Sequence, residues 1–168
     1  MGVGSWNVHI RLAVPGDGRA IEAMLLEAAR WVDSLGVTMW EEGELASRRI
    51  RSEIRLEQFF IAECDGDPAG AVRFQLEDRQ FWPDIPQDDS AFVHRLVVRR
   101  QYQGRGISTA LLEWAVDRAR ALGKTYLRLD CDEDRPKLRA LYERFGFLLH
   151  SFRQVGPYYV ARYQYPLS

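Results

Sequence analysis

One segment, residues 96–112, constrains the fold of this chain more than any other, because it joins a strand, a turn and a helix within seventeen residues. Its sequence is LVVRRQYQGRGISTALL. The β-branched residues Val97 and Val98 indicate a buried strand, whereas Ile107 and Leu111 recur at helical spacing. Glycines between these two patterns let the backbone turn without hindrance from a Cβ atom. The helix is therefore expected to begin directly after the glycines.

The start of this helix is suited to bind a phosphate group. Its first amides have no carbonyl partners inside the helix, and the aligned peptide dipoles make this end positive. Arg99, Arg100 and Arg105 add positive charge beside it. A P-loop would require a Gly-Lys-Ser/Thr ending, which this segment lacks, so ATP hydrolysis is not expected.

A dinucleotide-binding turn is a competing interpretation of the same residues. Gly104 and Gly106 are followed by Thr109 at the position of a third glycine, and Asp130 lies near the distance expected of a ribose-binding acid. However, the turn comes late in the chain, and only one clear strand-helix-strand unit surrounds it. We therefore rank this interpretation second.

Composition favours a single small domain over residues 1–168. The 168 residues are 46% hydrophobic, which allows an adequate core, and no stretch resembles a linker. A net charge of −1 gives no overall attraction to nucleic acid or to an anionic membrane. We find neither a secretory signal nor a run of ~20 apolar residues, so we expect a cytoplasmic protein without a membrane partner. Cys64 and Cys131 are too few for a disulfide framework, and no metal ligand set is predicted.

Hydrophobic spacing predicts most of the elements. The expected strands are 8–14, 59–64, 69–76, one that ends at 98, 147–155 and 158–165. The first expected helix ends at Gly36, the second spans about 44–57 and the third begins at 107. Residues 127–131 and 136–147 resemble a strand and a helix of a known family and complete the order β-α-α-β-β-β-α-β-α-β-β. Many charged residues in the second helix suggest an exposed, partly mobile lid. This order predicts an α/β fold with a mixed, mostly antiparallel central sheet and helices on both faces.

The glycine turn resembles the acyl-CoA cradle of the GNAT family of N-acetyltransferases, where it is written Q/R-x-x-G-x-G/A. Here it falls on residues 103–108, with Ser108 in place of the final glycine or alanine. Residues 136–147, PKLRALYERFGF, resemble the late helix of that family, which ends in Tyr-Glu-x-x-Gly-Phe. Arg135 stands where many relatives carry an asparagine that contacts the cofactor or caps the helix. The resemblance covers nearly the whole chain and implies a GNAT-like fold with acetyl-CoA as cosubstrate and no metal.

The resemblance also implies which residues hold the cofactor. The expected contacts are Leu96, Val97, Val98, Gln103, Gly104, Arg105, Gly106, Ile107, Ser108, Thr109 and Arg135. The amide-rich pantetheine arm can add like a strand beside residues 96–98, and a free backbone N–H there could polarise the acetyl carbonyl. Leu96 and Val98 are both candidates for that N–H.

Tyr142 and His94 are the predicted catalytic residues. In the family resembled, the tyrosine of the late helix lies near the thioester sulfur and can protonate the departing thiolate. Helical spacing with Leu138 and Phe145 allows the alternative that Tyr142 only packs the core. His94 lies in the strand that enters the turn and titrates in a useful range for a general base, although a lone strand histidine is more often a hydrogen-bonded structural group.

Substrate selection is assigned to two aromatic segments. Trp40 and Glu41 follow the first helix, and Trp82 lies in the central loop, so flat apolar surface and acids could hold a cationic amine. The alternative is that these tryptophans cover the core. We expect an N-acetyltransferase that acts on a primary amine of a small molecule or peptide. The alternatives are a silent acyl-CoA-binding sensor module and a dinucleotide-binding protein; pairing of C-terminal strands between two copies would give a homodimer.

Overall fold

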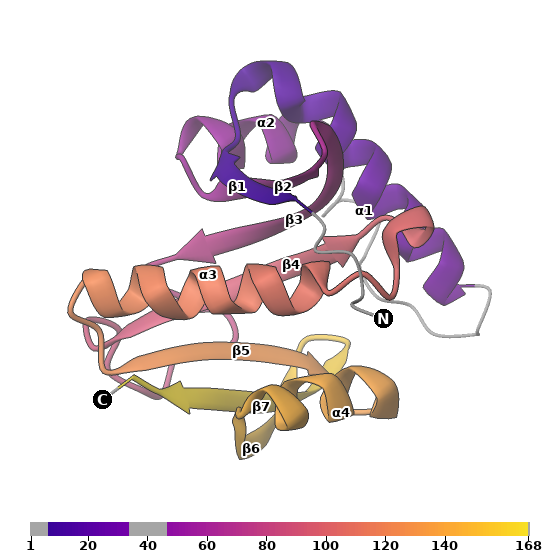
Figure 1. Cartoon of the computed structure of the whole chain (residues 1–168). Helices are drawn as coiled ribbons and strands as arrows, with labels where there is room; N and C mark the ends of the chain where they lie inside the picture. The colour runs from indigo at the N-terminus through magenta and orange to yellow at the C-terminus, as the bar shows by residue number, and fades with distance from the viewer. Residues whose placement is uncertain (1–6, 34–46, 168) are drawn as a thin grey trace, which may run out of the picture. The chain divides into compact units, whose positions relative to one another are not determined.

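The computed structural model describes residues 7–33 and 47–167 (Figure 1). The elements are β1 (Val8–Leu12), the 3₁₀ helix η1 (Pro15–Asp17), α1 (Gly18–Asp33), α2 (Ser47–Arg55), β2 (Phe59–Cys64), β3 (Asp67–Gln75), β4 (Ser90–Val98), the 3₁₀ helix η3 (Arg100–Tyr102), α3 (Ile107–Ala121), β5 (Tyr126–Asp132), α4 (Pro136–Phe145), β6 (Leu148–Val155) and β7 (Tyr158–Pro166). The predicted order of strands and helices is confirmed. None of the helices within the described ranges is long and apolar enough to cross a membrane.

The seven strands form one mixed sheet in the order β1-β2-β3-β4-β5-β7-β6. Strand β2 pairs antiparallel with both β1 and β3. Strand β7 pairs antiparallel with both β5 and β6, whereas β4 and β5 are parallel. The prediction of a mixed, mostly antiparallel sheet is therefore confirmed.

The chain divides into two compact units. One contains Met1–Arg73 and Arg95–Leu112; the other contains Phe74–His94 and Glu113–Ser168. Strands β3 and β4 and helix α3 each contribute residues to both units, so the division does not follow the order of elements along the chain.

The core of the first unit joins α1 and α2 to three strands. The buried apolar residues that form it are Ala13, Ile21, Met24, Leu25, Ile50, Ile54, Phe59, Ile61, Ala71 and Val97. Ile21, Met24 and Leu25 place one face of α1 in this core, whereas Gly36, the expected end of the helix, lies outside the described residues.

Helix α2 corrects the expectation of a freely exposed helix. Its apolar residues Ile50 and Ile54 lie one turn apart and are fully buried, and Glu53 beside them is also buried. Its four arginines are exposed to solvent, which is why the charge count concealed this packing. Two isoleucines at i and i+4 are enough to anchor a nine-residue helix on a core.

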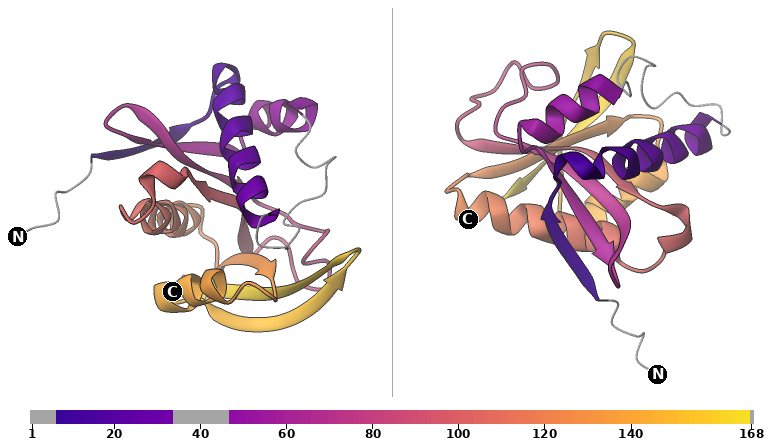
Figure 2. Two further views of the ribbon diagram at one scale, coloured as in Figure 1. Left: turned by 90° about the vertical axis from the view of Figure 1, so that its right-hand side faces the viewer. Right: turned by 90° about the horizontal axis from the view of Figure 1, so that it is seen from above.

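The second unit contains the C-terminal strands and the loop 76–89. Strands β6 and β7 form a long hairpin that turns at Gly156, where φ is +56° (Figure 2). Leu127, Leu129 and Tyr163 supply buried side chains from β5 and β7. Helix α4 ends at Phe145 and is capped by Gly146, whose φ of +123° lets the chain leave the helix.

Candidate functional site

The glycine turn, residues 103–106, lies in the first unit and has the predicted geometry. Gly104 and Gly106 have φ values of +78° and +76°, which side-chain-bearing residues rarely adopt, and α3 begins at Ile107. The Gln103 amide Nε2 donates a hydrogen bond to the Val98 carbonyl at 3.1 Å. This bond ties the turn to the end of β4, so the expected strand, turn and helix are confirmed.

The N-terminus of α3 directs amides out of the helix. The first backbone hydrogen bond at the start of α3 runs from the Ala110 amide to the Gly106 carbonyl oxygen, at 3.0 Å. The amides of Ile107, Ser108 and Thr109 therefore precede the helical ladder, at the positive end of the helix dipole. Such an end favours a phosphate group.

Two of the predicted arginines near this turn stack on aromatic rings. The Arg105 guanidinium carbon lies 5.0 Å from the centre of the Tyr102 ring, and that of Arg100 lies 4.4 Å from the Trp31 ring. The Arg100 backbone N–H also donates to Glu27 Oε1 at 2.9 Å. These cation–π contacts hold two guanidinium groups beside the turn.

The strand before the turn is packed closely against β3. A Cβ atom on Gly70 would lie 2.7 Å from the Val97 carbonyl oxygen, a distance at which something must shift. The Arg99 amide donates to Ala69 O at 2.8 Å. Val97 is buried, and Arg95 two residues earlier has φ of +53°, an unusual conformation for a residue inside a strand. The position of the turn is therefore set by β3 as well as by β4.

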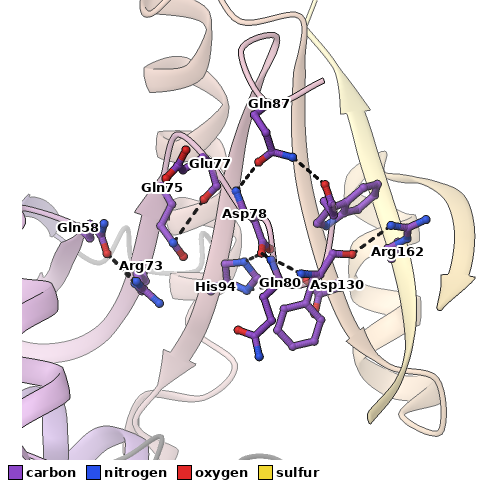
Figure 3. A network of polar contacts seen from close by, with 12 residues as sticks. Gln58, Arg73, Gln75, Glu77, Asp78, Gln80, Gln87, His94, Asp130 and Arg162 are labelled. Atoms are coloured by element: carbon purple, nitrogen blue, oxygen red, sulfur yellow. Dashed lines mark hydrogen bonds and ion pairs between the residues drawn. The ribbon is translucent and has the colours of Figure 1, made fainter. Parts of the chain in front are cut away.

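The second unit surrounds His94 with two carboxylates (Figure 3). His94 Nε2 lies 2.6 Å from Asp78 Oδ2, and His94 Nδ1 lies 3.8 Å from Asp130 Oδ2. Both acid side chains are at least nine-tenths buried, since Asp78 is 5% and Asp130 is 8% exposed. We call Asp78, His94 and Asp130 the His94 cluster.

The two carboxylates of the His94 cluster differ in acidity. Burial alone would raise the pKa of Asp78, but the hydrogen bond and the charge of His94 outweigh it and hold this pKa below its usual range. Burial raises the pKa of Asp130 to about 6, although the charge of His94 opposes this effect. Asp78 is therefore the firmly ionised partner, and Asp130 titrates close to neutrality.

The loop 76–89 is held by its own side chains. Asp78 Oδ1 accepts the amides of Gln80 at 3.1 Å and Phe81 at 3.0 Å. Gln87 accepts the Asp78 amide at 2.6 Å and donates to the Trp82 carbonyl at 2.7 Å. The carboxylate that orients His94 thus also organises this loop, as Figure 3 shows.

Trp82 packs this loop rather than facing a substrate. Its indole is fully buried, and the guanidinium carbons of Arg162 and Arg128 lie 4.6 and 5.3 Å from the ring centre. Arg162 also binds both carboxylate oxygens of Asp84, at 2.7 and 3.0 Å. A buried indole has no surface to offer an amine, which corrects the expectation that Trp82 contacts the substrate. Trp40 and Glu41 lie outside the described residues.

Tyr142 lies in α4 and is 5% exposed. Its ring packs against Phe147 and Tyr163, at centroid distances of 5.9 and 6.1 Å. Burial raises the pKa of its hydroxyl well above the usual range, and the nearby thiol of Cys131 and carboxyl of Asp130 act in the same direction. The phenol therefore keeps its proton at neutral pH and can serve as a proton donor, not as a base.

The predicted site residues are divided between the two units. The turn residues and Leu96, Val97 and Val98 lie in the first, whereas His94, Arg135, Tyr142 and Trp82 lie in the second. Arg135 is the residue at the N-cap of α4, where its side chain makes no capping hydrogen bond. The sequence interpretation missed Asp78 and named Asp130 only as a ribose-binding acid. The sequence did offer one signal for Asp130, because it is a charged residue between two apolar residues of an expected strand. Both neighbours, Leu129 and Cys131, are buried in the structure.

The His94 cluster is also where a cation could bind. One ligand atom from each of its three side chains lies within 4.8 Å of the others. Asp78 already bonds His94 Nε2 at 2.6 Å, so a metal ion that used this nitrogen would have to break that bond. A metal ion that leaves this bond intact would have to bind His94 through Nδ1.

Comparison with known proteins identifies the family. The model of the acetyltransferase (GNAT) family matches residues 23–147. The uncharacterized N-acetyltransferase YesJ of Bacillus subtilis is 30% identical over 142 residues, which cover 80% of this chain and 78% of that protein. Spermidine N(1)-acetyltransferase of Escherichia coli K12 is 28% identical over 108 residues, covering 61% of this chain and 54% of that protein.

Solved structures share the fold. A GNAT-family acetyltransferase of Listeria monocytogenes has a TM-score of 0.78 at 24% identity, with coverage of 98% of this chain and 99% of that chain. YncA of Salmonella typhimurium, solved with its cofactor acetyl-CoA, has a TM-score of 0.73 at 19% identity, with coverage of 96% and 95%. Because the family model matches most of the sequence, the chain belongs to the GNAT family of acetyltransferases.

Proposed function

We propose that this protein transfers the acetyl group of acetyl-CoA to a primary amine. The observation that carries the proposal is the glycine turn, where Gly104 and Gly106 adopt positive φ directly before the N-terminus of α3. Membership of the family and the acetyl-CoA bound by YncA, a protein of the same fold, support this choice of cosubstrate.

In this proposal the first unit binds the acyl donor. The amides of residues 107–109 and the guanidinium of Arg105 receive the pyrophosphate, and the strand residues Leu96 and Val98 receive the pantetheine arm. The ladder of β4 to β5 ends at Val93, so the amides of Leu96 and Val98 are not part of it. One of them would donate to the acetyl carbonyl. Arg135 is kept as a proposed cofactor contact.

The second unit supplies the proton transfers. A thioester is reactive enough to be attacked by a neutral amine without a metal, but an ammonium group must first lose a proton to become that amine, and the sulfur must gain one. We assign the first transfer to His94 and the second to Tyr142. The ammonium proton passes to His94, and the new C–N bond then forms as the C–S bond breaks. The second proton of the nitrogen passes to a neighbouring carboxylate, and the phenol proton passes to the sulfur.

Two measurements test the proposal. Calorimetry with acetyl-CoA, CoA and NAD should show binding of the first two, and binding of NAD alone would overturn it. Thiol release should then be followed with spermidine, an amino sugar, a lysine peptide and a peptide with a free N-terminus. Release with at least one amine is expected; binding of acetyl-CoA without release from any amine would indicate a sensor module instead.

Some expectations from the sequence stay predictions. They are a single domain over residues 1–168, a cytoplasmic location and a homodimer. The amine itself is also open, and the spermidine acetylation named for the Escherichia coli relative makes polyamines the first amines to test.

A further inference from the structure

We propose that Asp130 is the binding point for the ammonium group of the acceptor, and that the His94 cluster both holds this group and removes its proton. The inference rests on the proposed acetyl transfer and deepens it. It assigns a role to a carboxylate that the sequence interpretation left outside the acetyl-transfer machinery. The expected ligand is a primary ammonium with at least two N–H donors free.

The first observation is an incomplete hydrogen-bonding pattern. Asp130 Oδ2 is buried and has no hydrogen-bond partner among the described residues. Its side chain is only 8% exposed, so bulk water does not readily satisfy it. Buried carboxylate oxygens without donors are uncommon because the desolvation is costly. An oxygen in this state is available to an N–H donor of a ligand.

The second observation is the spacing of the acceptors. One atom from each of Asp78, His94 and Asp130 lies within 4.8 Å of the others. Within the cluster, Asp78 Oδ2 is already bonded to His94 Nε2, whereas His94 Nδ1 and Asp130 Oδ2 lie 3.8 Å apart. One ammonium nitrogen can reach both of these atoms with hydrogen bonds of about 2.9 Å. A quaternary ammonium carries the same charge but has no N–H to donate.

The third observation identifies the nitrogen that takes the proton. Because Asp78 is ionised and accepts at 2.6 Å, the proton on His94 belongs on Nε2, and Nδ1 carries the lone pair. Nδ1 lies 3.8 Å from Asp130 Oδ2, which is too far for a direct hydrogen bond. An ammonium nitrogen at about 2.9 Å from each of these atoms fits between them.

The proton balance follows from this arrangement. The bound ammonium gives one proton to His94 Nδ1 and becomes a neutral amine with a free lone pair, while the imidazole becomes an imidazolium. Asp78 and Asp130 then flank that positive charge and stabilise it. The amine lone pair forms the new C–N bond as the C–S bond breaks, Asp130 takes the second proton from this nitrogen, and the phenol proton of Tyr142 passes to the departing sulfur.

The charges around Asp130 are consistent with a cationic ligand. The groups that act on it are His94, Asp78 and Arg162, and it acts in turn on Tyr142 and Cys131. Arg162 is already bound to Asp84 through both carboxylate oxygens, which reduces its effect on the cluster. Two carboxylates thus share the cluster with a single imidazole.

The test compares two ligands by NMR of protein labelled with ¹⁵N-histidine, with CoA present so that no acetyl transfer occurs. The chain has three histidines, and the variant H94Q identifies the His94 signals. We expect n-propylamine to shift these signals and N,N,N-trimethylpropylammonium to leave them unchanged. Equal shifts with both ligands, or no shift with propylamine, would overturn the proposal, and so would a shift caused only by Zn²⁺. Both ligands are compared on the natural protein, and H94Q serves only to assign its signals.

The variant D130N provides the kinetic test, with D117N as its control. Asp117 lies on α3, its side chain is 80% exposed, and the substitution removes the same charge. With the amine that gives the fastest thiol release, D130N should raise KM for the amine about tenfold or more and leave KM for acetyl-CoA unchanged. An unchanged KM for the amine in D130N would contradict the assignment. If the natural protein acetylates no amine, the proposed function fails, whereas the NMR comparison still decides whether the ammonium site exists.

Discussion

His94 Nε2 lies 2.6 Å from Asp78 Oδ2, and this contact determines the tautomer of the imidazole. An ionised carboxylate can only accept, so Nε2 must donate. The other oxygen of Asp78 accepts two amides of the loop 76–89, which prevents the carboxylate from turning away. A general base is useful only when the correct nitrogen carries the lone pair, and here the loop and the base share one orienting residue.

The variant D78N should reverse this tautomer. Its amide oxygen can still accept the amides of Gln80 and Phe81, while its NH₂ group donates to His94 Nε2 and moves the ring proton to Nδ1. We expect kcat to fall by about 10²- to 10⁴-fold, the usual contribution of a general base. Steady-state rates and ¹⁵N shifts of His94 should be measured together. A changed tautomer with an unchanged kcat would show that His94 is not the base.

The variant D130N should be more stable than the natural protein at pH 7.5. The pKa of Asp130 is raised to about 6 from an ordinary value of 3.8, so the folded protein binds this proton more tightly than the unfolded chain does. Its contribution therefore becomes less favourable as pH rises from about 4 to above 6. Asparagine removes this penalty, on the order of 1–3 kcal/mol in the free energy of unfolding at pH 7.5.

Chemical unfolding at pH 4 and pH 7.5 checks this expectation. The difference between D130N and the natural protein should appear at the higher pH and nearly vanish at the lower one. D117N should show no such pH dependence, because Asp117 is exposed. A D130N protein that is less stable at pH 7.5 would contradict a buried, poorly solvated Asp130 carboxylate.

The variant Y142F should lose activity while it keeps its fold. The Tyr142 hydroxyl makes no hydrogen bond to a residue within the described ranges, and phenylalanine retains the ring contacts with Phe147 and Tyr163. Unfolding free energy should therefore change by less than about 1 kcal/mol. Without a proton donor for the thiolate, kcat should fall by about 10²-fold. If thiol release keeps its natural rate, Tyr142 is only a packing residue.

The variant G106A should weaken CoA binding. Nothing lies within 4 Å of the added Cβ, so the effect arises from φ of +76° rather than from a clash. Strain of about 1–2 kcal/mol should displace the amides at the start of α3. Gly123 is a matched control, because it follows α3 with φ of +74° and open space around its Cβ. Calorimetry should show weaker CoA binding for G106A, and equal losses in G106A and G123A would argue against a specific turn.

Much of the fold could be predicted because local patterns determine it. The glycine turn, the start of α3 and the hairpin of β2 and β3 each depend on turn residues and on spacing within a short segment. Helix α2 was harder, because its arginines suggested full exposure although Ile50 and Ile54 are buried. A short helix with only two apolar residues, both on the same face, gives a weak periodic signal.

The His94 cluster could not be read from local spacing. Asp78 precedes His94 by 16 residues along the chain, and Asp130 comes from another strand altogether. Side chains that meet through the pairing of β4 with β5 leave no common motif. The burial of Trp82 could not be predicted either. An aromatic residue in a polar loop suggests an exposed side chain, but the guanidinium groups of Arg128 and Arg162 pack over this ring.

The internal bonding of the loop 76–89 determines how this protein could be re-engineered. Gln87 bonds Asp78 and Trp82, and Arg162 on β7 bonds Asp84, so a graft that divides the loop would separate donors from their acceptors. A transplant would have to carry residues 78–87 as one cassette and bring the arginine with it. Libraries built by recombination should place their crossover points outside this segment.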